Sequence, residues 1–340
     1  MTNIELPLAF GSSIRVVCLM HAYHRGKGKL MILNTGNRTD IPAFYSEWFC
    51  NRIREGYVFA RNPYNPQQVT RYLLDPETVD CITFCTKNPE PMLDKLHHLI
   101  GFRQFWAVTI TPYSEDIEPY VPSKEEVMTS FCMLSEQVGK HAVCWRYDPI
   151  FITDKYTVNY HLEAFAQMAA ELSGHTDQCV ISFLDLYDKT KRNFPAGRSV
   201  TKKERLTIGK AFAEIGQKHG IKVYTCAEGD ELEPFGIDCS GCQSKAVLER
   251  AIGLPLEVPK SAMTRKECQC VLGCDIGAYN TCGHGCLYCY ANYDQKTVEE
   301  NMMQHNPDSP FLIGGFLDGD IIKSVEQESW IRRQISFLDF

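Results

Sequence analysis

Short apolar runs alternate with helical stripes of apolar residues along much of the chain. Six runs of four to seven residues predict strands, at positions 31–34, 81–84, 104–110, 142–147, 179–184 and 222–226. The segments between them carry apolar residues at helical spacing, for example Val127, Phe131, Leu134 and Val138. Strands that alternate with amphipathic helices indicate a parallel sheet with right-handed crossovers. The pattern predicts an α/β fold, a complete or partial (β/α) barrel of the TIM type.

Local signals place the ends of several helices. Asp40, followed by Pro42, predicts a helix start, and Ser123 with Glu126 and Thr201 with Glu204 form two capping boxes. One helix is expected over residues 92–100, with Gly101 ending it. Two further runs, 57–60 and 69–74, flank a proline–asparagine turn and predict a hairpin inserted between strand and helix units.

The chain divides into three parts on this pattern. Residues 1–30 are an N-terminal extension that ends in a basic, glycine-punctuated linker, and Met31 is an alternative start of translation. Residues 31–260 hold the barrel units. Residues 261–340 hold a cysteine-rich segment and a C-terminal tail, which we expect to pack on the same domain. We expect the barrel to fold without residues 1–30.

Composition limits the cellular compartments and the kinds of partner that are expected for this protein. The net charge of −7 gives no sign of a polyanionic partner, and no apolar run reaches the length of a membrane span. There is no evident signal peptide, so we expect a cytoplasmic protein. Many of the 16 cysteines fall inside predicted strands and helices, which is typical of buried thiols in a reducing compartment.

Three cysteines near the C-terminus form the most specific motif. Cys282, Cys286 and Cys289 stand at a C-x3-C-x2-C spacing with Tyr288 before the last of them. Thiolates select iron–sulfur clusters, zinc or copper(I). Three ligands leave one iron of a 4Fe–4S cluster open, and the motif resembles the radical S-adenosylmethionine (SAM) signature, in which that iron binds SAM. The resemblance implies Cys282, Cys286 and Cys289 as cluster ligands and places Tyr288 and Asn292 beside the cofactor.

A second group of cysteines precedes this motif. Four of them predict a second metal site, either zinc or another iron–sulfur cluster: Cys239, Cys242, Cys268 and Cys270. Cys274 lies close by in sequence. The alternative is that these cysteines are incidental neighbours of a single cluster.

Polar residues follow the predicted strands. In a barrel the carboxyl ends of the strands carry function, so we expect these residues to line one substrate-binding mouth. The candidates are Asp40, Lys87, Arg146, Asp148, Asp185 and Glu228. Each has a structural alternative: Asp40 is placed to cap a helix, and Arg146 with Asp148 to form an ion pair. Charges gathered in one mouth are costly to bury without a purpose.

Several longer segments resemble the bacterial and archaeal "domain of unknown function 1848" family. They are RTDIPAFYSEW from Arg38, TKNP from Thr86, WRYDP from Trp145, SFLDLY from Ser182, YTCAE from Tyr224 and DIGAY from Asp275. The family is described as having a C-terminal cysteine cluster like that of radical SAM enzymes, which implies a class of chemistry and no substrate. Spore photoproduct lyase, a radical SAM repair enzyme, is a distant analogy.

The chain departs from the expected pattern at several points. Asn37 replaces an expected arginine and Cys85 an expected tryptophan. The cysteine motif follows six strand–helix units, whereas in ordinary radical SAM enzymes it follows the first strand. A circularly permuted barrel, with residues 275–280 as the strand before the motif, would reconcile the two orders. Gly314-Gly315 is a weak match to the glycine-rich segment that binds the SAM amine.

The favoured hypothesis is a radical-SAM-like enzyme that abstracts hydrogen from a polar substrate, either a small molecule or a nucleic-acid-derived one. Its cofactors would be a 4Fe–4S cluster and SAM, with reduced ferredoxin or flavodoxin as electron donor. Two alternatives stay open. One is an iron–sulfur redox or sensing protein without SAM chemistry, and the other is a zinc-stabilised binding module.

Overall fold

The computed structural model describes residues 31–184, 188–259, 263–265, 268–271 and 273–332. The N-terminal extension 1–30, with the question of a start at Met31, and the candidate Asp185 therefore lie outside the described residues. So does the side chain of Cys268. None of the described helices is both long and apolar enough to cross a membrane.

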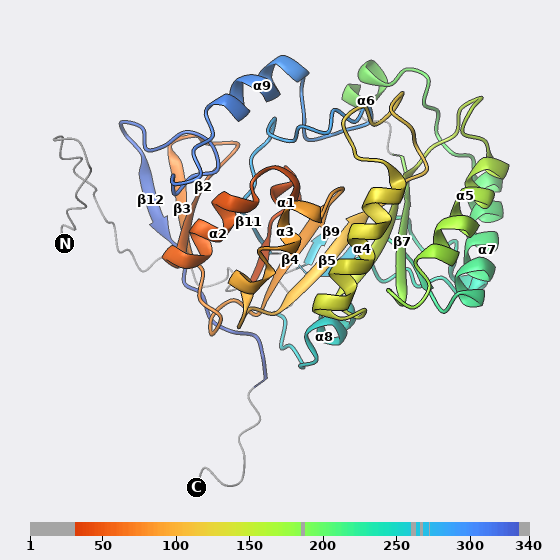
Figure 1. The fold of residues 1–340 in the computed structure, drawn as a ribbon, viewed down its shortest axis with the longest axis horizontal. Helices are drawn as coiled ribbons and strands as arrows, with labels where there is room; N and C mark the ends of the chain where they lie inside the picture. The colour runs from red at the N-terminus through yellow and green to blue at the C-terminus, as the bar shows by residue number, and fades with distance from the viewer. Residues whose placement is uncertain (1–30, 185–187, 260–262, 266–267, 272, 333–340) are drawn as a thin grey trace, which may run out of the picture.

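A seven-stranded, all-parallel sheet forms the centre of the fold (Figure 1), in the order β11-β1-β4-β5-β6-β7-β8. Its strands are β1 (Ile32–Asn34), β4 (Cys81–Thr86), β5 (Gln104–Thr109), β6 (Val143–Ile150), β7 (Gln178–Phe183), β8 (Lys222–Thr225) and β11 (Cys274–Asp275). The α/β class with a parallel sheet is confirmed. Among the described residues the hydrogen-bonded order ends at β8 and β11, so the ladder does not close into a complete barrel.

Helices cover the sheet and connect its strands. They are α1 (Ile41–Phe44), α2 (Ser46–Glu55), α3 (Glu90–Leu93), α4 (Lys124–Val138), α5 (Val158–Glu171), α6 (Asp188–Asn193), α7 (Lys202–Lys218), α8 (Lys245–Ile252) and α9 (Gln295–Met303), with 3-10 turns η1 (Leu96–Leu99) and η2 (Glu233–Phe235). Both predicted capping boxes are present, because Ser123 and Thr201 each exchange hydrogen bonds with the glutamate three residues on.

The single helix expected over 92–100 is wrong, since α3 and η1 replace it. The Lys95 ammonium donates to the Pro91 carbonyl at 3.0 Å, the acceptor that a continuing α-helix would offer to the Lys95 amide. The Lys95 amide bonds instead to Met92 O at 3.0 Å, which is the tighter 3-10 spacing.

The predicted hairpin is confirmed as β2 (Tyr57–Arg61) and β3 (Gln68–Leu73), which pair antiparallel. A strand from the C-terminal part, β12 (Ile321–Ser324), adds to β3 in parallel. A second small ladder joins β9 (Met263–Arg265) to β10 (Cys268–Val271).

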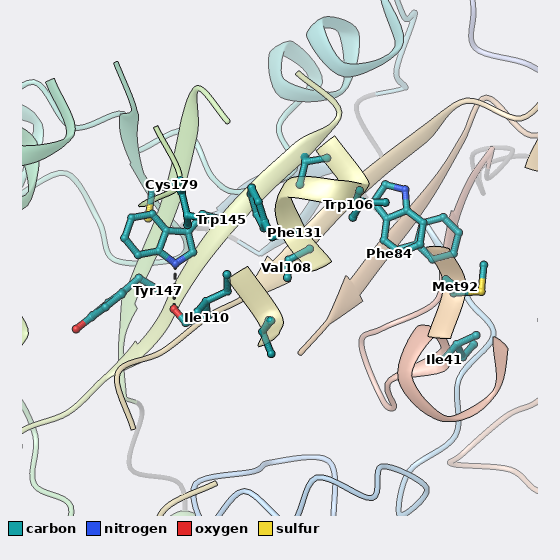
Figure 2. Close-up of a cluster of buried hydrophobic side chains, with 14 of the residues drawn as sticks. Ile41, Phe84, Met92, Trp106, Val108, Ile110, Phe131, Trp145, Tyr147 and Cys179 are labelled. Atoms are coloured by element: carbon teal, nitrogen blue, oxygen red, sulfur yellow. Dashed lines mark hydrogen bonds between the residues drawn. The ribbon is translucent and has the colours of Figure 1, made fainter. Parts of the chain in front are cut away.

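Alternation along the strands divides the core into two faces. On β5, Trp106 and Val108 belong to the larger cluster, which packs beneath helices such as α4 through Phe131 (Figure 2), whereas Phe105 and Ala107 belong to a separate inner cluster. In the larger cluster the Trp145 indole N–H donates to Ile110 O at 3.0 Å. The inner cluster is completed by Val247 and Leu248 of α8, which lies below the sheet in Figure 1, whereas α9 lies above it.

The inner face changes from apolar to polar along the strands. On β6 the outward residues are Val143, Trp145 and Tyr147, so the period of two turns Cys144, Arg146 and Asp148 to the other face. Cys144 lies in the inner apolar cluster, and Arg146 and Asp148 follow it towards the carboxyl end. This alternation delivers charged groups to the end of the sheet where parallel-sheet proteins bind their ligands.

Candidate functional site

The polar strand ends form a connected set of side chains, which we call the polar mouth. Its described members are Asp40, Lys87, Glu118, Arg146, Asp148 and Glu228. The first group lies after β1 and β4. One oxygen of the Asp40 carboxylate accepts from the Ala43 amide at 3.1 Å and caps α1, and the other accepts from the Lys87 amide at 2.8 Å. Asp40 is thus a helix cap that also joins two strand ends.

Glu118 is the most completely bonded member of the polar mouth, and the sequence analysis missed it. Its side chain is 1% exposed and accepts from the ammonium groups of Lys87 at 2.8 Å and Lys124 at 2.5 Å. Thr111 Oγ1 donates to it at 2.7 Å, and the Tyr288 hydroxyl also donates to it. Burial alone would raise the pKa of Glu118, but the two lysines outweigh it and hold the pKa at about 2.

Arg146 and Asp148 form an ion pair with side chains that are only 15% and 18% exposed. The Ser182 hydroxyl donates to the second oxygen of Asp148, and Glu228 accepts from the Phe183 amide at 2.8 Å. Burial opposes the charge of Arg146, yet Asp148 and neighbouring thiols raise its pKa well above the usual value. A ligand that bound Arg146 or Asp148 would therefore have to share or break this ion pair. Both side chains are partly exposed, so a ligand could reach them.

The cysteine motif lies in a segment, residues 281–292, that we call the cluster loop. Its anchors reach the carboxyl ends of the sheet strands. His284 Nε2 lies 2.8 Å from Asp40, the Leu287 amide donates to Ile117 O at 3.0 Å, and Tyr45 donates to Thr281 O at 2.6 Å. The loop follows β11, which pairs with β1 at one end of the sheet.

The cluster loop and the polar mouth are in electrostatic contact. Burial would lower the pKa of Lys87, but Glu118, followed by Cys286 and Asp148, raises it above the usual value. Cys282 interacts with Asp40. The structure therefore places the C-x3-C-x2-C motif and the predicted mouth residues Asp40, Lys87 and Asp148 at the same end of the sheet.

The cluster loop gathers three thiols, but their sulfurs do not all lie within 4.8 Å of one another, a wider spacing than one tetrahedral ion needs. Cys282, Cys286 and Cys289 interact with one another, and burial raises the pKa of the Cys282 thiol well above its usual value and that of Cys286 to about 12. Metal binding removes such protons, because the thiolate is the ligand. Gly285 has φ +67°, and a Cβ there would lie 2.8 Å from the Tyr120 ring, so this turn requires glycine.

The two residues expected beside SAM have contacts within the protein. Tyr288 is 9% exposed, packs among Tyr113 and Phe151 and donates to Glu118. Asn292 Nδ2 donates to Cys282 O at 2.7 Å, while its buried Oδ1 has no hydrogen-bond partner in the described structure. Both residues support the cluster loop, and their contact with SAM stays a prediction. Gly315 O lies elsewhere, accepting from Arg61 at 2.9 Å near the small sheet.

A second set of thiols, which we call the seam thiols, comprises Cys226, Cys242 and Cys270. Their sulfurs all lie within 4.8 Å of one another, the only such group of potential metal ligands among the described residues. Cys242 Sγ is 3.3 Å from Cys226 Sγ and 3.5 Å from Cys270 Sγ, well beyond a disulfide bond. Of the second-site candidates, Cys242 and Cys270 therefore come together, whereas Cys239 Sγ points towards Ile237 O at 3.9 Å.

The sequence did not indicate Cys226 as a ligand, because this residue is the last of the strand predicted over 222–226. The alternation of β8 could have indicated it: Tyr224 is in the inner cluster, so the residue two positions on shares its face.

One family model matches most of the chain. The model of a family described as "Domain of unknown function (DUF1848)" matches residues 32–291. The chain belongs to this family. The matched range contains all seven strands of the central sheet, the polar mouth, the seam thiols and the whole cysteine motif of the cluster loop. A comparison with curated proteins finds no match. Membership of the DUF1848 family thus agrees with the resemblance in the sequence and brings no assigned reaction with it.

Proposed function

We propose that this protein is a radical-SAM-like enzyme whose cluster loop holds a 4Fe–4S cluster through Cys282, Cys286 and Cys289. The observation that carries the proposal is that Glu118 accepts hydrogen bonds both from Lys87 of the polar mouth and from Tyr288 of the cluster loop. Hydrogen abstraction would require the cofactor and the substrate to be in contact, so the motif and the mouth would have to share one end of the sheet.

The strand order supports a permuted partial barrel as the scaffold. β1 and β4 to β8 are neighbours in chain order, and β11 lies on the other side of β1. β11 therefore stands first in spatial order although it is the last of the seven strands in the chain. It covers only Cys274–Asp275 of the strand expected over 275–280, and residues 276–280 connect it to the cluster loop. This is the position that the motif occupies in ordinary radical SAM barrels, which the resemblance implies as relatives. The C-terminal segment would then complete the same domain as residues 31–260.

Cys282, Cys286 and Cys289 would hold a 4Fe–4S cluster, which together with SAM would supply the chemistry of hydrogen abstraction. The chain's own residues do the rest. Lys87, Arg146 and Asp148 would orient a polar substrate through charged hydrogen bonds. The aromatic wall of Tyr113, Phe151 and Tyr288 would exclude water from the reacting atoms. Reduced ferredoxin or flavodoxin would deliver the electron.

Glu118 has a positioning role in this proposal. It accepts from Lys87 on one side and from Tyr288 of the cluster loop on the other. Since its pKa is held at about 2, it stays a carboxylate at any physiological pH and keeps both partners in place. Glu118 thereby links the ligand loop to the mouth.

The test is anaerobic reconstitution with iron and sulfide, followed by addition of SAM. We expect a SAM-dependent change in the electron paramagnetic resonance spectrum of the reduced cluster, and 5′-deoxyadenosine as a product. A cluster whose spectrum ignores SAM would favour an iron–sulfur redox or sensing protein. No iron with one zinc per chain would favour a zinc-stabilised binding module.

A further inference from the structure

The seam thiols have the geometry of a site for one metal ion. In a tetrahedral zinc site with Zn–S bonds of about 2.3 Å, neighbouring sulfurs lie about 3.8 Å apart. The observed separations of 3.3 and 3.5 Å, with all three sulfurs inside 4.8 Å, are close to that value. A cubane cluster instead places each thiolate on a different iron, which sets the sulfurs farther apart. The geometry therefore favours one ion over a second cluster.

These thiols lie where the central sheet fails to close. Beyond β8, the Thr225 amide donates to Asp238 O at 3.0 Å, and the Asp238 amide donates to Val223 O at 3.0 Å. The chain then reaches Cys242, and the segment returning towards β11 pairs with it where the Val271 amide donates to Gln243 O at 2.9 Å. Cys226, Cys242 and Cys270 thus come from the three chain segments that these backbone pairings join between β8 and β11.

The surroundings suit a negatively charged thiolate site. Arg146 is an electrostatic neighbour of both Cys226 and Cys242. Three thiolates and a divalent ion carry one net negative charge, which the nearby guanidinium offsets only in part because Arg146 also pairs with Asp148. The Gln243 amide donates to Cys270 Sγ at 3.3 Å, the kind of contact that stabilises a metal-bound sulfur.

One buried polar atom beside the thiols lacks a partner. Ser244 is 5% exposed and pairs with Cys270 in an isolated bridge, but its hydroxyl has no hydrogen-bond partner in the described part of the chain. A buried hydroxyl without a partner is uncommon. A metal-bound thiolate, or a water in the fourth coordination position, would supply that partner.

We propose that Cys226, Cys242 and Cys270 bind a single zinc-type divalent ion that clamps the seam between β8 and the segment returning to β11. Three protein thiolates leave one of four coordination positions for a ligand from outside this set. The ion replaces, across the gap, the hydrogen-bond ladder that a closed barrel would have. This site is independent of the 4Fe–4S cluster and of SAM.

The full-length chain, prepared under anaerobic conditions, tests the proposal with zinc and with cobalt(II) as a coloured substitute. We expect one zinc per chain, and with cobalt the thiolate charge-transfer and tetrahedral ligand-field bands. Cys226→Ser, Cys242→Ser and Cys270→Ser should each weaken cobalt binding at least tenfold, while the nearby Cys239→Ser should bind like the unaltered chain. Removing the ion with a chelator should lower Tm of the unaltered chain and leave that of Cys242→Ser unchanged.

The controls separate this site from the cluster loop. The triple variant Cys282→Ala, Cys286→Ala, Cys289→Ala should lose iron and keep the zinc. Zinc retained in all three seam variants would overturn the proposal, as would iron and sulfide, in place of zinc, disappearing with them. Should the seam variants fail to fold, the cobalt titration of the triple Cys282→Ala, Cys286→Ala, Cys289→Ala variant decides alone, because the cluster-loop thiols are absent from it. A spectrum without thiolate bands then overturns the site.

Discussion

The two sets of thiols in this protein are built in opposite ways. Cys282, Cys286 and Cys289 lie within eight consecutive residues, so a single turn with glycines brings them together. Cys226, Cys242 and Cys270 span 45 residues and meet only because the sheet is folded. A local motif can be recognised from the sequence, and the fold only determines where the motif lies. A dispersed site needs the fold for its existence.

The contrast extends to what each set stabilises. The cluster loop is held from outside by Asp40, Glu118 and Tyr45, so its anchors exist whether or not a metal is bound. The seam is joined by two isolated bridges, Tyr224 with Asp238 and Ser244 with Cys270, and not by a continuous ladder among the described residues, so a metal there would add to the stability of the fold itself. We therefore expect metal removal to affect function at the first site and stability at the second.

The sharpest test of this contrast is the iron content of cysteine variants. Cys282→Ala, Cys286→Ala and Cys289→Ala should each remove most of roughly four iron atoms per chain, since each thiolate binds one iron of the cluster. Far-ultraviolet circular dichroism should be unchanged. Cys226→Ser should keep its iron and lose thermal stability. Full iron in all three loop variants would reject the cluster assignment.

Features that depend on residues close together in the sequence were predicted better than features that depend on residues far apart. The capping boxes at Ser123 and Thr201 depend on residues three positions apart, and the structure has both. The helix over 92–100 was wrong because the Lys95 side chain, which periodicity ignores, takes the carbonyl of Pro91. The alternation of strands and helices predicted a parallel sheet. Whether β8 and β11 pair depends on which side chains fill the inner face, and a local pattern does not show that.

The same reasoning explains the site. The polar mouth was predicted from strand ends, because parallel strands present their carboxyl ends at one edge. Glu118 was not, since it lies in the long segment between β5 and α4, where nothing in the pattern marks one acidic residue among several. Cys226 required knowing which of the nearby cysteines face inward together. Sequence spacing alone does not show which of several acidic residues or cysteines come together in the folded protein.

The second prediction concerns the link between cluster loop and mouth. Glu118→Gln removes a carboxylate whose pKa of about 2 lies below its usual 4.5, so the charge contributes about 3 kcal/mol to the free energy of unfolding above pH 4.5. That contribution is lost as pH falls from 4.5 towards 2. Denaturant unfolding should show the difference from the unaltered chain at pH 7 and a smaller one at pH 3.

The matched control is Glu125→Gln, an exposed glutamate in the first turn of α4. It should change the free energy of unfolding by less than about 0.5 kcal/mol. A Glu118→Gln effect that stays constant from pH 7 to pH 3 would mean that the lysines do not depress the pKa of this carboxyl.

The third prediction separates the mouth from the loop. Asp148→Asn takes the negative partner from Arg146, which should cost about 2 kcal/mol, typical of a hydrogen bond to a charged group. Glu228→Gln should cost less, because one of its bonds is to the neutral Phe183 amide. Iron content should be unchanged in both variants. If the iron content and the melting temperature of these variants decrease together, the polar mouth has only a structural role in supporting the cluster loop.

The smallest expected effect tests whether Asp40 does more than cap a helix. Asp40→Asn keeps a side-chain oxygen for the Ala43 amide, but its amide group cannot accept from Lys87 N and His284 as the carboxylate does. We expect a loss of about 1–2 kcal/mol and slower iron loading, because His284 belongs to the cluster loop. Asp294→Asn is the matched control: Asp294 caps α9 through the Thr297 amide at 2.8 Å, and Asn serves nearly as well as Asp in that role. Unfolding and iron uptake are measured on both. If the two substitutions behave alike, Asp40 is an ordinary cap, and the cluster loop owes its place over β1 and β4 to Glu118 and Tyr45 instead.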